Sequence, residues 1–155
     1  MTKETIGFIG IGNMGGPISK NLVAANYNVV GYDTAGTLER VPEGAAVGRN
    51  AGDVATRSDI IMMSLPDGKI VQEVTEEVIA TNDRRAATVI DVSTSGVAAE
   101  RAASARCRNS EIEFYEAPVS GGVPGARAGT ISIMFAGTEE AFGRLKPVLE
   151  SIGQP

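Results

Sequence analysis

The fold of this chain is decided by residues 6–15, IGFIGIGNMG. An apolar run, Ile6–Ile9, leads directly into a G-x-G-x-x-G pattern, and an amphipathic stretch follows from Met14 to Ala25. This order predicts a buried strand, a tight turn and a helix, the context in which such glycines cradle a pyrophosphate. The residues expected to line that cradle are Gly10, Ile11, Gly12, Asn13, Met14 and Gly15.

Each glycine has its own reason in this pattern. Gly10 permits the sharp turn, Gly12 removes the Cβ that would hold a phosphate away, and Gly15 lets the helix pack close to the strand. The start of the helix offers unpaired N–H groups and a partial positive charge of about 0.5 to an anion. A turn that binds nothing is the alternative, because tight turns use glycine freely.

An acidic residue follows the next predicted strand, Asn28–Tyr32. Asp33 lies 18 residues after Gly15. A carboxylate at this spacing accepts hydrogen bonds from the ribose hydroxyls of adenosine and repels a 2′-phosphate. Together with the glycine pattern, Asp33 favours NAD over NADP as the cofactor and weakens the alternative of a turn that binds nothing.

Strand and helix patterns alternate along the chain. We expect strands at Thr5–Ile9, Asn28–Tyr32, Ile60–Ser64, Thr88–Val92, Glu113–Glu116 and Ile131–Ala136, with a further short one at Ala45–Val47. We expect helices at Met14–Ala25, Asn50–Thr56, Ile70–Ala80, Val97–Arg108 and Glu139–Ile152, and a turn into a short helix at Thr34–Thr37. The glycine-rich segment Gly121–Gly129 is expected to form a loop or a broken helix. This alternation predicts an α/β fold of Rossmann type, a doubly wound, mainly parallel sheet with helices on both faces.

The length of 155 residues suits one dinucleotide-binding domain over residues 1–155. The net charge of −5 offers no broad basic field, so nucleic acid is not an expected partner. No run of about 18 apolar residues is present, so no membrane span is expected. A single cysteine, Cys107, and an N-terminus without a signal-peptide pattern favour the cytoplasm.

The chain contains no histidine. This excludes a histidine general base, a histidine-containing nucleophilic triad and histidine metal ligation. No cluster of Asp and Glu residues has metal-ligand spacing, so no metal is expected. Cys107 is expected to be a packed helix residue rather than a nucleophile, because no basic group that is also held in order is evident beside it.

In open parallel sheets, ligands bind beyond the carboxyl ends of the strands. The segments that follow the predicted strand ends carry turn or hydroxyl residues: Gly10–Gly15, Asp33–Thr34, Leu65–Asp67, Ser93–Ser95 and Ala117–Gly122.

Four segments resemble, in order and spacing, the β-hydroxyacid dehydrogenases. They are GFIGIGNMGGP at residues 7–17, MSLPD at 63–67, DVST at 91–94, and EAPVSGGVPGA at 116–126 followed by AGT at 128–130. The last segment is far more specific than the glycine pattern. The family includes 3-hydroxyisobutyrate dehydrogenase, tartronate semialdehyde reductase and, more distantly, 6-phosphogluconate dehydrogenase.

The resemblance implies roles for residues at the strand ends. The residues implied to line the cofactor are Leu65, Pro66 and, near the nicotinamide, Thr94. The residues implied to bind the substrate carboxylate or hydroxyl are Ser93, Ser120, Gly121 and Gly122. Each has a structural alternative: a strand end for Leu65 and Pro66, a helix cap for Ser93 or Thr94, and a loop for Ser120–Gly122.

The chain departs from the family pattern in two places. Val97 stands where the family has a proline that presets the first helical turn. The family's catalytic lysine, in a K-x-x-N motif, is expected after Pro155, so no catalytic residue is assigned in this chain and Lys146 is not given that role. The resemblance thus implies a cofactor domain that binds NAD but is inactive alone. An absent C-terminal helical domain would supply the lysine, complete the hydroxy-acid site and form a homo-oligomer interface.

Two alternatives stay open at this point. One is a non-catalytic nucleotide-binding scaffold or sensor of the same fold. The other is an imine reductase-like enzyme that prefers NADP, against which Asp33 argues.

Overall fold

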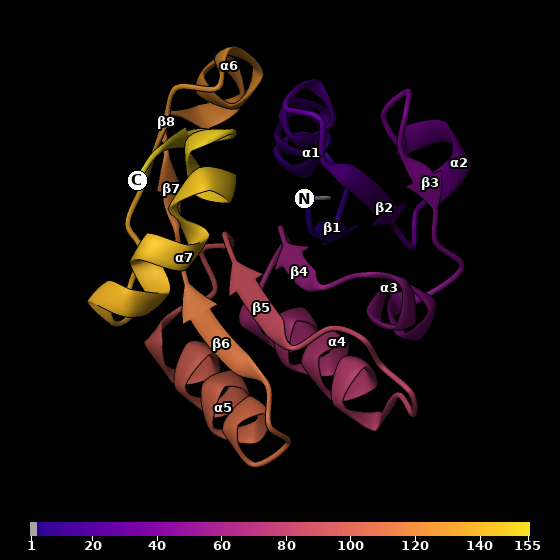
Figure 1. Cartoon of the computed structure of the whole chain (residues 1–155), viewed down its shortest axis with the longest axis vertical. Helices are drawn as coiled ribbons and strands as arrows, with labels where there is room; N and C mark the ends of the chain where they lie inside the picture. Colours follow the sequence, from indigo (N-terminus) through magenta and orange to yellow (C-terminus); the bar gives the residue numbers. More distant parts are fainter. Residues whose placement is uncertain (1–2) are drawn as a thin grey trace.

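A six-stranded parallel sheet forms the centre of the computed structural model, which describes residues 3–155 (Figure 1). The strand order is β3-β2-β1-β4-β5-β6. The strands are β1 Thr5–Ile9, β2 Asn28–Tyr32, β3 Ala46–Val47, β4 Ile60–Met63, β5 Thr88–Asp91 and β6 Glu113–Glu116. The chain moves outward from β1 to β3 and then returns to β4 on the other side of β1. This reversal creates a crevice between β1 and β4, where such sheets bind ligands.

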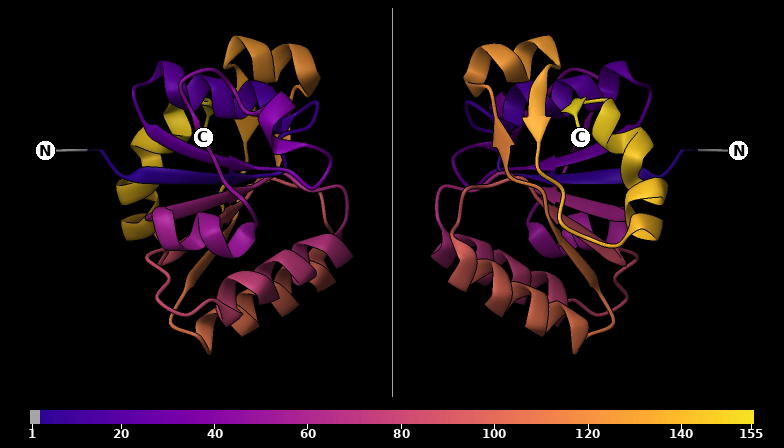
Figure 2. Two further views of the ribbon diagram at one scale, coloured as in Figure 1. Left: turned by 90° about the vertical axis from the view of Figure 1, so that its right-hand side faces the viewer. Right: turned by 90° about the vertical axis from the view of Figure 1, so that its left-hand side faces the viewer.

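Helices cover both faces of this sheet, as Figure 2 shows. The helices that pack on one face are α1 Gly15–Ala24, α6 Gly122–Ala128 and α7 Glu139–Glu150. Those on the other face are α3 Ala51–Arg57, α4 Gly68–Ala80 and α5 Val97–Arg108. A short helix, α2 Thr37–Arg40, follows β2. The predicted doubly wound α/β fold is therefore confirmed.

Strand β4 shows how the sequence produces two cores. Ile60 and Met62 belong to the core on the α1 side, whereas Ile61 and Met63 belong to the core on the α4 side. Successive side chains of a strand point to opposite faces, so a strand covered on both faces needs apolar residues throughout. All four side chains are buried.

A small second sheet follows the parallel one. It contains β7 Val119–Ser120, β8 Ile131–Ile133 and β9 Gly153–Gln154. Strand β7 runs antiparallel to β8, and β9 runs parallel to it. The strand predicted over Ile131–Ala136 is therefore shorter than expected and lies outside the main sheet.

The glycine-rich segment after β7 forms helix α6, where a loop or a broken helix was expected. The side-chain amide of Asn21 on α1 donates to the carbonyl of Ala126 on α6 at 2.7 Å. Ala126 is fully buried in the core on the α1 side. Contacts with α1 thus stabilise a helix that its own glycines disfavour.

Two helix starts are positioned by the residues just before them. Helix α4 begins two residues earlier than predicted, because the Asp67 carboxylate accepts the N–H of Ile70 at 3.0 Å. Helix α5 begins at Val97, as predicted, after Gly96 at φ 89°, so neither Ser93 nor Thr94 caps it. Within residues 3–155, no helix has the length and apolar character that crossing a bilayer requires.

Candidate functional site

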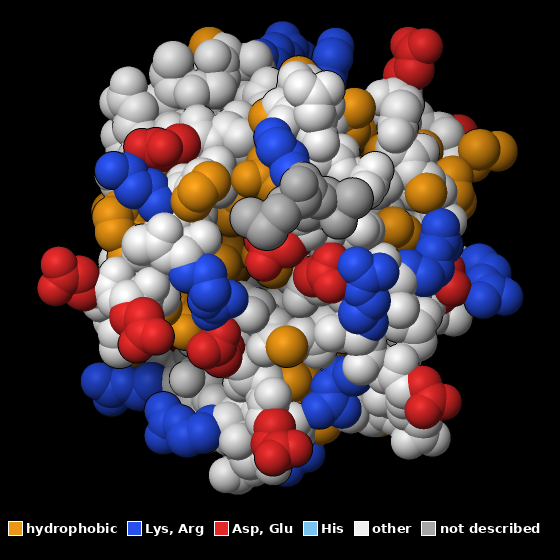
Figure 3. Space-filling model, viewed as in Figure 1, with side chains coloured by type: hydrophobic (Ala, Val, Ile, Leu, Met, Phe, Trp, Pro, Cys, Tyr) orange, Lys and Arg blue, Asp and Glu red, His pale blue; other side chains and the backbone are white. Residues whose placement is uncertain are grey.

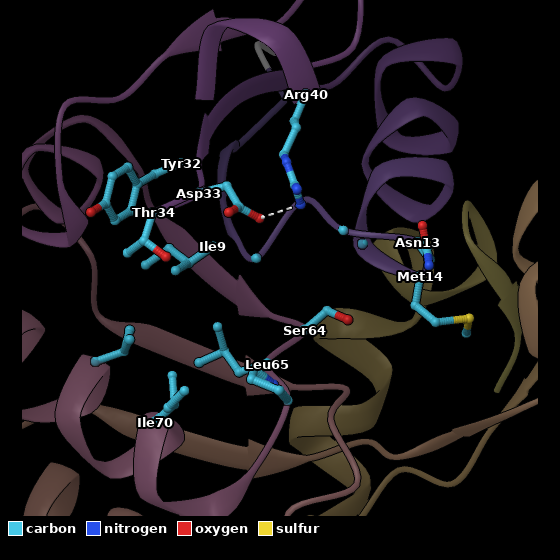
Figure 4. A pocket seen from close by; sticks show the side chains of 15 residues that line it. Ile9, Asn13, Met14, Tyr32, Asp33, Thr34, Arg40, Ser64, Leu65 and Ile70 are labelled. Carbon is cyan, nitrogen blue, oxygen red and sulfur yellow. Dashed lines mark ion pairs between the residues drawn. The ribbon is translucent and has the colours of Figure 1, made fainter. Parts of the chain in front are cut away.

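A cleft of about 470 Å³ lies at the carboxyl ends of β1, β2 and β4 (Figure 4). It is lined by Ile9, Gly10, Gly12, Asn13, Met14, Gly15, Tyr32, Asp33, Thr34, Arg40, Ser64, Leu65, Pro66, Ile70 and Val74. The cleft brings together most of the cofactor-binding residues predicted from the sequence. Ile11 and Thr94 are not among its lining residues.

The three motif glycines differ in what surrounds them. Gly10 has φ +94°, and a Cβ there would overlap the carbonyl oxygen of Ser64. A Cβ on Gly15 would overlap the carbonyl oxygen of Gly10. A Cβ on Gly12, in contrast, would meet only Arg40 Nη1, at 3.9 Å. Gly10 and Gly15 are therefore required by the chain itself, whereas the space beside Gly12 is open toward the cleft.

Unpaired backbone donors surround this space. Within residues 3–155, the N–H groups of Gly12, Asn13 and Met14 have no hydrogen-bond acceptor. No side chain caps α1, and its first turn contains no acidic residue. Free N–H groups at the positive end of a helix, next to a position without a side chain, fit a phosphate group. The turn therefore fits the pyrophosphate of a dinucleotide.

Asp33 lies at the edge of the cleft beside the glycine turn. Its carboxylate accepts the N–H groups of Ile11 and Ala35, each at 2.8 Å, and is 11% exposed. These bonds hold the carboxylate in place while leaving acceptor capacity for a ligand, because two carboxylate oxygens offer about four lone-pair positions.

Arg40 faces Asp33 across the rim of the cleft, with 3.7 Å between Arg40 Nη1 and Asp33 Oδ2 (Figure 4). The sequence prediction did not single out Arg40. Its only sequence signal is a basic residue within the short helix expected after Asp33, and this signal does not show which way the side chain points.

The opposite side of the cleft is apolar. Leu65 and Ile70 lie across the cleft from Asp33 in Figure 4, and Val74, which follows Ile70 by one turn of α4, also lines the cleft. Ile70 and Val74 were not predicted as site residues, although their spacing of four places them on one face of α4. The cleft thus combines a polar, donor-rich side with an apolar side, which suits a ligand with both charged and flat apolar parts.

Ser93 lies behind the cleft wall rather than in it. The side chain is buried, and its hydroxyl accepts the N–H of Leu65 at 2.8 Å. The N–H of Ser93 donates to Asp91 Oδ1 at 2.9 Å. Ser93 therefore ties the loop after β4 to the loop after β5.

The other predicted substrate residues lie apart from the cleft. Ser120 ends β7, and Gly121 and Gly122, at φ +132° and +63°, lead into α6; all three are exposed. Thr94, predicted near the nicotinamide, is exposed in the loop after β5. The roles given to these residues and to Ser93 remain predictions.

The lining residues of the cleft include no lysine and no cysteine. Lys146 Nζ pairs with Glu150 on α7 at 3.6 Å. Cys107 is fully buried, and burial raises the pKa of its thiol to about 11, as expected of an inert core residue. Within residues 3–155, no group of three acidic or cysteine side chains is placed to hold a metal ion.

Charges of both signs are interspersed on the face of the molecule in Figure 3. Several arginines of the chain pair with acids, such as Arg106 with Glu76 and Arg144 with Glu113, wherever they lie on the surface. This face therefore presents no single-signed field that would attract a polyanion.

Comparison with known proteins agrees with this geometry. Residues 5–155 match the model of the NAD binding domain of 6-phosphogluconate dehydrogenase. A probable 3-hydroxyisobutyrate dehydrogenase of Mycobacterium bovis is 40% identical over 148 residues, covering 94% of this chain and 50% of the relative. The 2-(hydroxymethyl)glutarate dehydrogenase of Eubacterium barkeri is 35% identical over 153 residues, covering 96% of this chain and 51% of the relative.

A solved structure shows the same likeness. The 3-hydroxyisobutyrate dehydrogenase of Mycobacterium tuberculosis, solved with L-serine, superposes with a TM-score of 0.91 and is 37% identical. The match covers 99% of this chain and 53% of that one. The chain thus spans about half the length of these relatives, and the resemblance predicted from the sequence is confirmed. Because the family model matches nearly the whole chain, the protein belongs to the family of the NAD binding domain of 6-phosphogluconate dehydrogenase.

Proposed function

We propose that this chain is the cofactor-binding half of an oxidoreductase that transfers hydride between NAD and a small 3-hydroxy acid. The observation that supports this most directly is the open space beside Gly12, which faces unpaired N–H groups and lies next to the fixed carboxylate of Asp33. When bound, the nicotinamide ring would accept or give the hydride. The residues of this chain would hold its pyrophosphate and adenosine ribose.

NAD is favoured over NADP because of Asp33. Its carboxylate would accept a hydrogen bond from a ribose hydroxyl and repel a 2′-phosphate. Arg40 opposes that repulsion, but its guanidinium is 42% exposed and lies 3.7 Å from the carboxylate, so water and salt screen its charge. We therefore expect a preference for NAD that is moderated by Arg40.

The names of the relatives point to one substrate class. Three compounds appear in these names: 3-hydroxyisobutyrate, 2-(hydroxymethyl)glutarate and, in the solved structure, L-serine. Each has a hydroxymethyl group on the carbon that bears the carboxylate. We propose a 2-substituted 3-hydroxypropanoate, oxidised at its hydroxymethyl carbon. The hydroxyl groups of Ser93 and Ser120 and the backbone N–H groups of Gly121 and Gly122 would contribute to binding the carboxylate, as the resemblance implies.

The substrate hydroxyl must lose its proton as hydride leaves. The family's lysine, which would take this proton, has no counterpart among the lining residues of the cleft. We propose that the lysine implied by the resemblance lies outside residues 1–155, in a helical domain that completes the substrate site and forms a homo-oligomer interface. This chain would then bind NAD without turning over substrate. A reducing compartment such as the cytoplasm would suit its single, buried Cys107.

The experiment compares a protein extended beyond residue 155 with the 155-residue chain. Formation of NADH is followed with 3-hydroxyisobutyrate, L-serine and, as a control without the hydroxymethyl group, lactate. The extended protein should oxidise a 3-hydroxy acid but not lactate, and the 155-residue chain should oxidise neither. Oxidation by the 155-residue chain, or a preference for lactate, would contradict the proposal.

A second candidate is a nucleotide-binding scaffold or sensor, which the absence of lysine from the cleft lining favours. It predicts NAD binding by the extended protein without hydride transfer to any hydroxy acid. An imine reductase-like function predicts tighter binding of NADP than of NAD, which conflicts with the position of Asp33.

A further inference from the structure

Two acidic side chains are buried together behind the cleft. Asp91, at the end of β5, is 1% exposed, and Glu100, in the first turns of α5, is 6% exposed. Within residues 3–155, neither Asp91 nor Glu100 forms an ion pair with a lysine or an arginine. Buried carboxylates without a cation cannot both stay charged at low cost. At least one of the two must therefore hold a proton at neutral pH.

The hydroxyl of Ser95 connects the two acids. Ser95 Oγ is in hydrogen-bond contact with Glu100 Oε1 and lies 3.3 Å from Asp91 Oδ2. A hydroxyl has one proton, so it can donate to only one of these oxygens. A proton on Glu100 removes the conflict, because the carboxylic acid can donate to Ser95 while Ser95 donates to Asp91. The second oxygen of Glu100, Oε2, is buried without any partner, as suits a neutral acid better than an anion.

The same acids are linked to the cleft wall. Asp91 Oδ1 accepts the N–H of Ser93 at 2.9 Å, and the Ser93 hydroxyl accepts the N–H of Leu65 at 2.8 Å. Leu65 lines the cleft. A continuous series of contacts thus runs from Glu100 through Ser95, Asp91 and Ser93 to Leu65; we call it the Glu100 network.

We propose that Glu100 is a positioning residue whose proton keeps the Glu100 network intact and thereby holds the loops of Leu65 and Ser93 in place at the cofactor cleft. Loss of this proton would leave two buried negative charges competing for one hydroxyl proton. The loop after β5 would then move, and the Leu65 loop would lose its fixed acceptor. The effect on the cofactor rests on the proposed function, whereas the effect on the loops does not.

The charges around Glu100 all act in one direction. Burial raises the pKa of Glu100 most; hydrogen bonding with Asp91 and the negative charges of Asp91 on β5 and Glu116 on β6 raise it further, to about 9. Other charged side chains of the packed elements pair elsewhere: Lys69 with Glu73 and Glu76 with Arg106 at α4, and Glu113 on β6 with Arg144. Glu100 is therefore neutral at pH 7, and the network is lost as the pH rises through the pKa of its folded state.

The first test needs no cofactor. In the 155-residue chain, the carboxyl carbon shift of Glu100 and the amide shifts of Leu65 and Ser93 are followed by NMR from neutral to alkaline pH. The three signals should share one midpoint near pH 9. In Glu100→Gln the two amides should stop titrating. In Ser95→Ala the carboxyl should still titrate without moving the Leu65 amide. A Glu100 midpoint near its ordinary value of 4.5, or unchanged amide titrations in Glu100→Gln, would overturn the proposal.

The second test measures NADH binding against pH, with circular dichroism to verify that the chain stays folded. The dissociation constant of NADH for the wild type should be about tenfold higher at one pH unit above the pKa of Glu100 than at neutral pH, because only the chain with protonated Glu100 keeps the loops in place. Glu100→Gln should bind with nearly constant affinity, and Glu73→Gln, an exposed control on α4, should follow the wild type. Amides that titrate while NADH affinity stays constant would refute the link to the cofactor. Absence of NADH binding at every pH would refute the proposed function, and the NMR titration would still decide whether Glu100 holds the loops.

Discussion

Replacing Asp33 by alanine should weaken NAD binding strongly and tighten NADP binding slightly. In the structure the Asp33 carboxylate is fixed by two N–H donors, from Ile11 and Ala35, and has Arg40 at 3.7 Å. The substitution removes the acceptor expected for the ribose hydroxyl and, at the same time, the charge that would repel a 2′-phosphate. The two dinucleotides should therefore respond in opposite directions.

The size of the effect follows from these contacts. A hydrogen bond to a charged group contributes about 1.5–3 kcal/mol, so NAD should bind about 10–150-fold more weakly. Without Asp33, Arg40 is free to pair with a 2′-phosphate; an exposed ion pair contributes up to about 1 kcal/mol, so NADP should bind up to about fivefold more tightly. The fold should also lose about 1–3 kcal/mol, because the N–H of the buried Ile11 loses its acceptor.

Calorimetric titration of NAD and NADP into the wild type and Asp33→Ala measures the ratio of the two dissociation constants. Asp59→Ala is a matched control, because Asp59 accepts the N–H of Thr5 at 2.7 Å and pairs with Arg85 at 2.6 Å, but precedes β4 at the amino-terminal edge of the sheet. It should lower stability without changing the ratio. Tighter binding of NADP than of NAD by the wild type, or an unchanged ratio in Asp33→Ala, would refute the role given to Asp33.

Three further predictions concern stability and reactivity. Hydrogen bonds from Arg49, and then from Arg57, lower the pKa of Asp53 from 3.8 to about 2. The ionised Asp53 therefore stabilises the fold fully at a pH above its pKa in the unfolded chain, and this stabilisation is lost as the pH falls through its pKa in the folded chain. Urea unfolding measured at several acidic pH values should show that the wild type loses about 1–2 kcal/mol of its free energy of unfolding in this range, whereas Asp53→Asn does not; this figure allows for solvent screening of the exposed arginines. Identical acid profiles of the two proteins would contradict this. Gly15→Ala should lower the free energy of unfolding by about 1–3 kcal/mol, because its Cβ would overlap the Gly10 carbonyl, whereas Gly143→Ala on α7, with nothing within 4 Å, should be neutral or stabilising by up to about 1 kcal/mol; equal unfolding midpoints would be inconsistent with the tight packing at Gly15. Cys107 should react with a thiol reagent only after urea unfolding, since it is fully buried with its pKa raised to about 11; rapid labelling of the folded chain would disprove this.

The parallel sheet and its glycine turn could be predicted because their signals are local. Runs such as Ile60–Met63 are apolar throughout, as strands buried on both faces must be. The second sheet has no such signal, because β7 and β9 are two residues long and are defined only by pairing with β8. Helix α6 was missed for a related reason: Gly122 and Gly125 disfavour a helix locally, and contacts with α1 outweigh them.

The site could be predicted only where sequence spacing fixes position. Gly10–Gly15 and Asp33 follow neighbouring strands, so topology alone brings them together. The positions of the Arg40 and Glu100 side chains depend on how α2 and the first turn of α5 lie relative to their neighbours, which no periodicity in the sequence encodes. The contact of Ser93 with the substrate stays a prediction, and the sequence did not show that its hydroxyl also accepts the N–H of Leu65.

The most direct test is calorimetric titration of NAD into the wild type, Gly12→Ala and the control Gly143→Ala. The space beside Gly12 is open, because a Cβ at this position would lie 3.9 Å from Arg40 Nη1. The Gly12→Ala variant should therefore fold normally, while its methyl group blocks the approach of the pyrophosphate. We predict that the wild type and Gly143→Ala bind NAD equally and that Gly12→Ala binds at least about tenfold more weakly, a loss of about 1.4 kcal/mol. No binding of NAD by the wild type, or equal binding by Gly12→Ala, would show that the glycine turn is not a dinucleotide cradle.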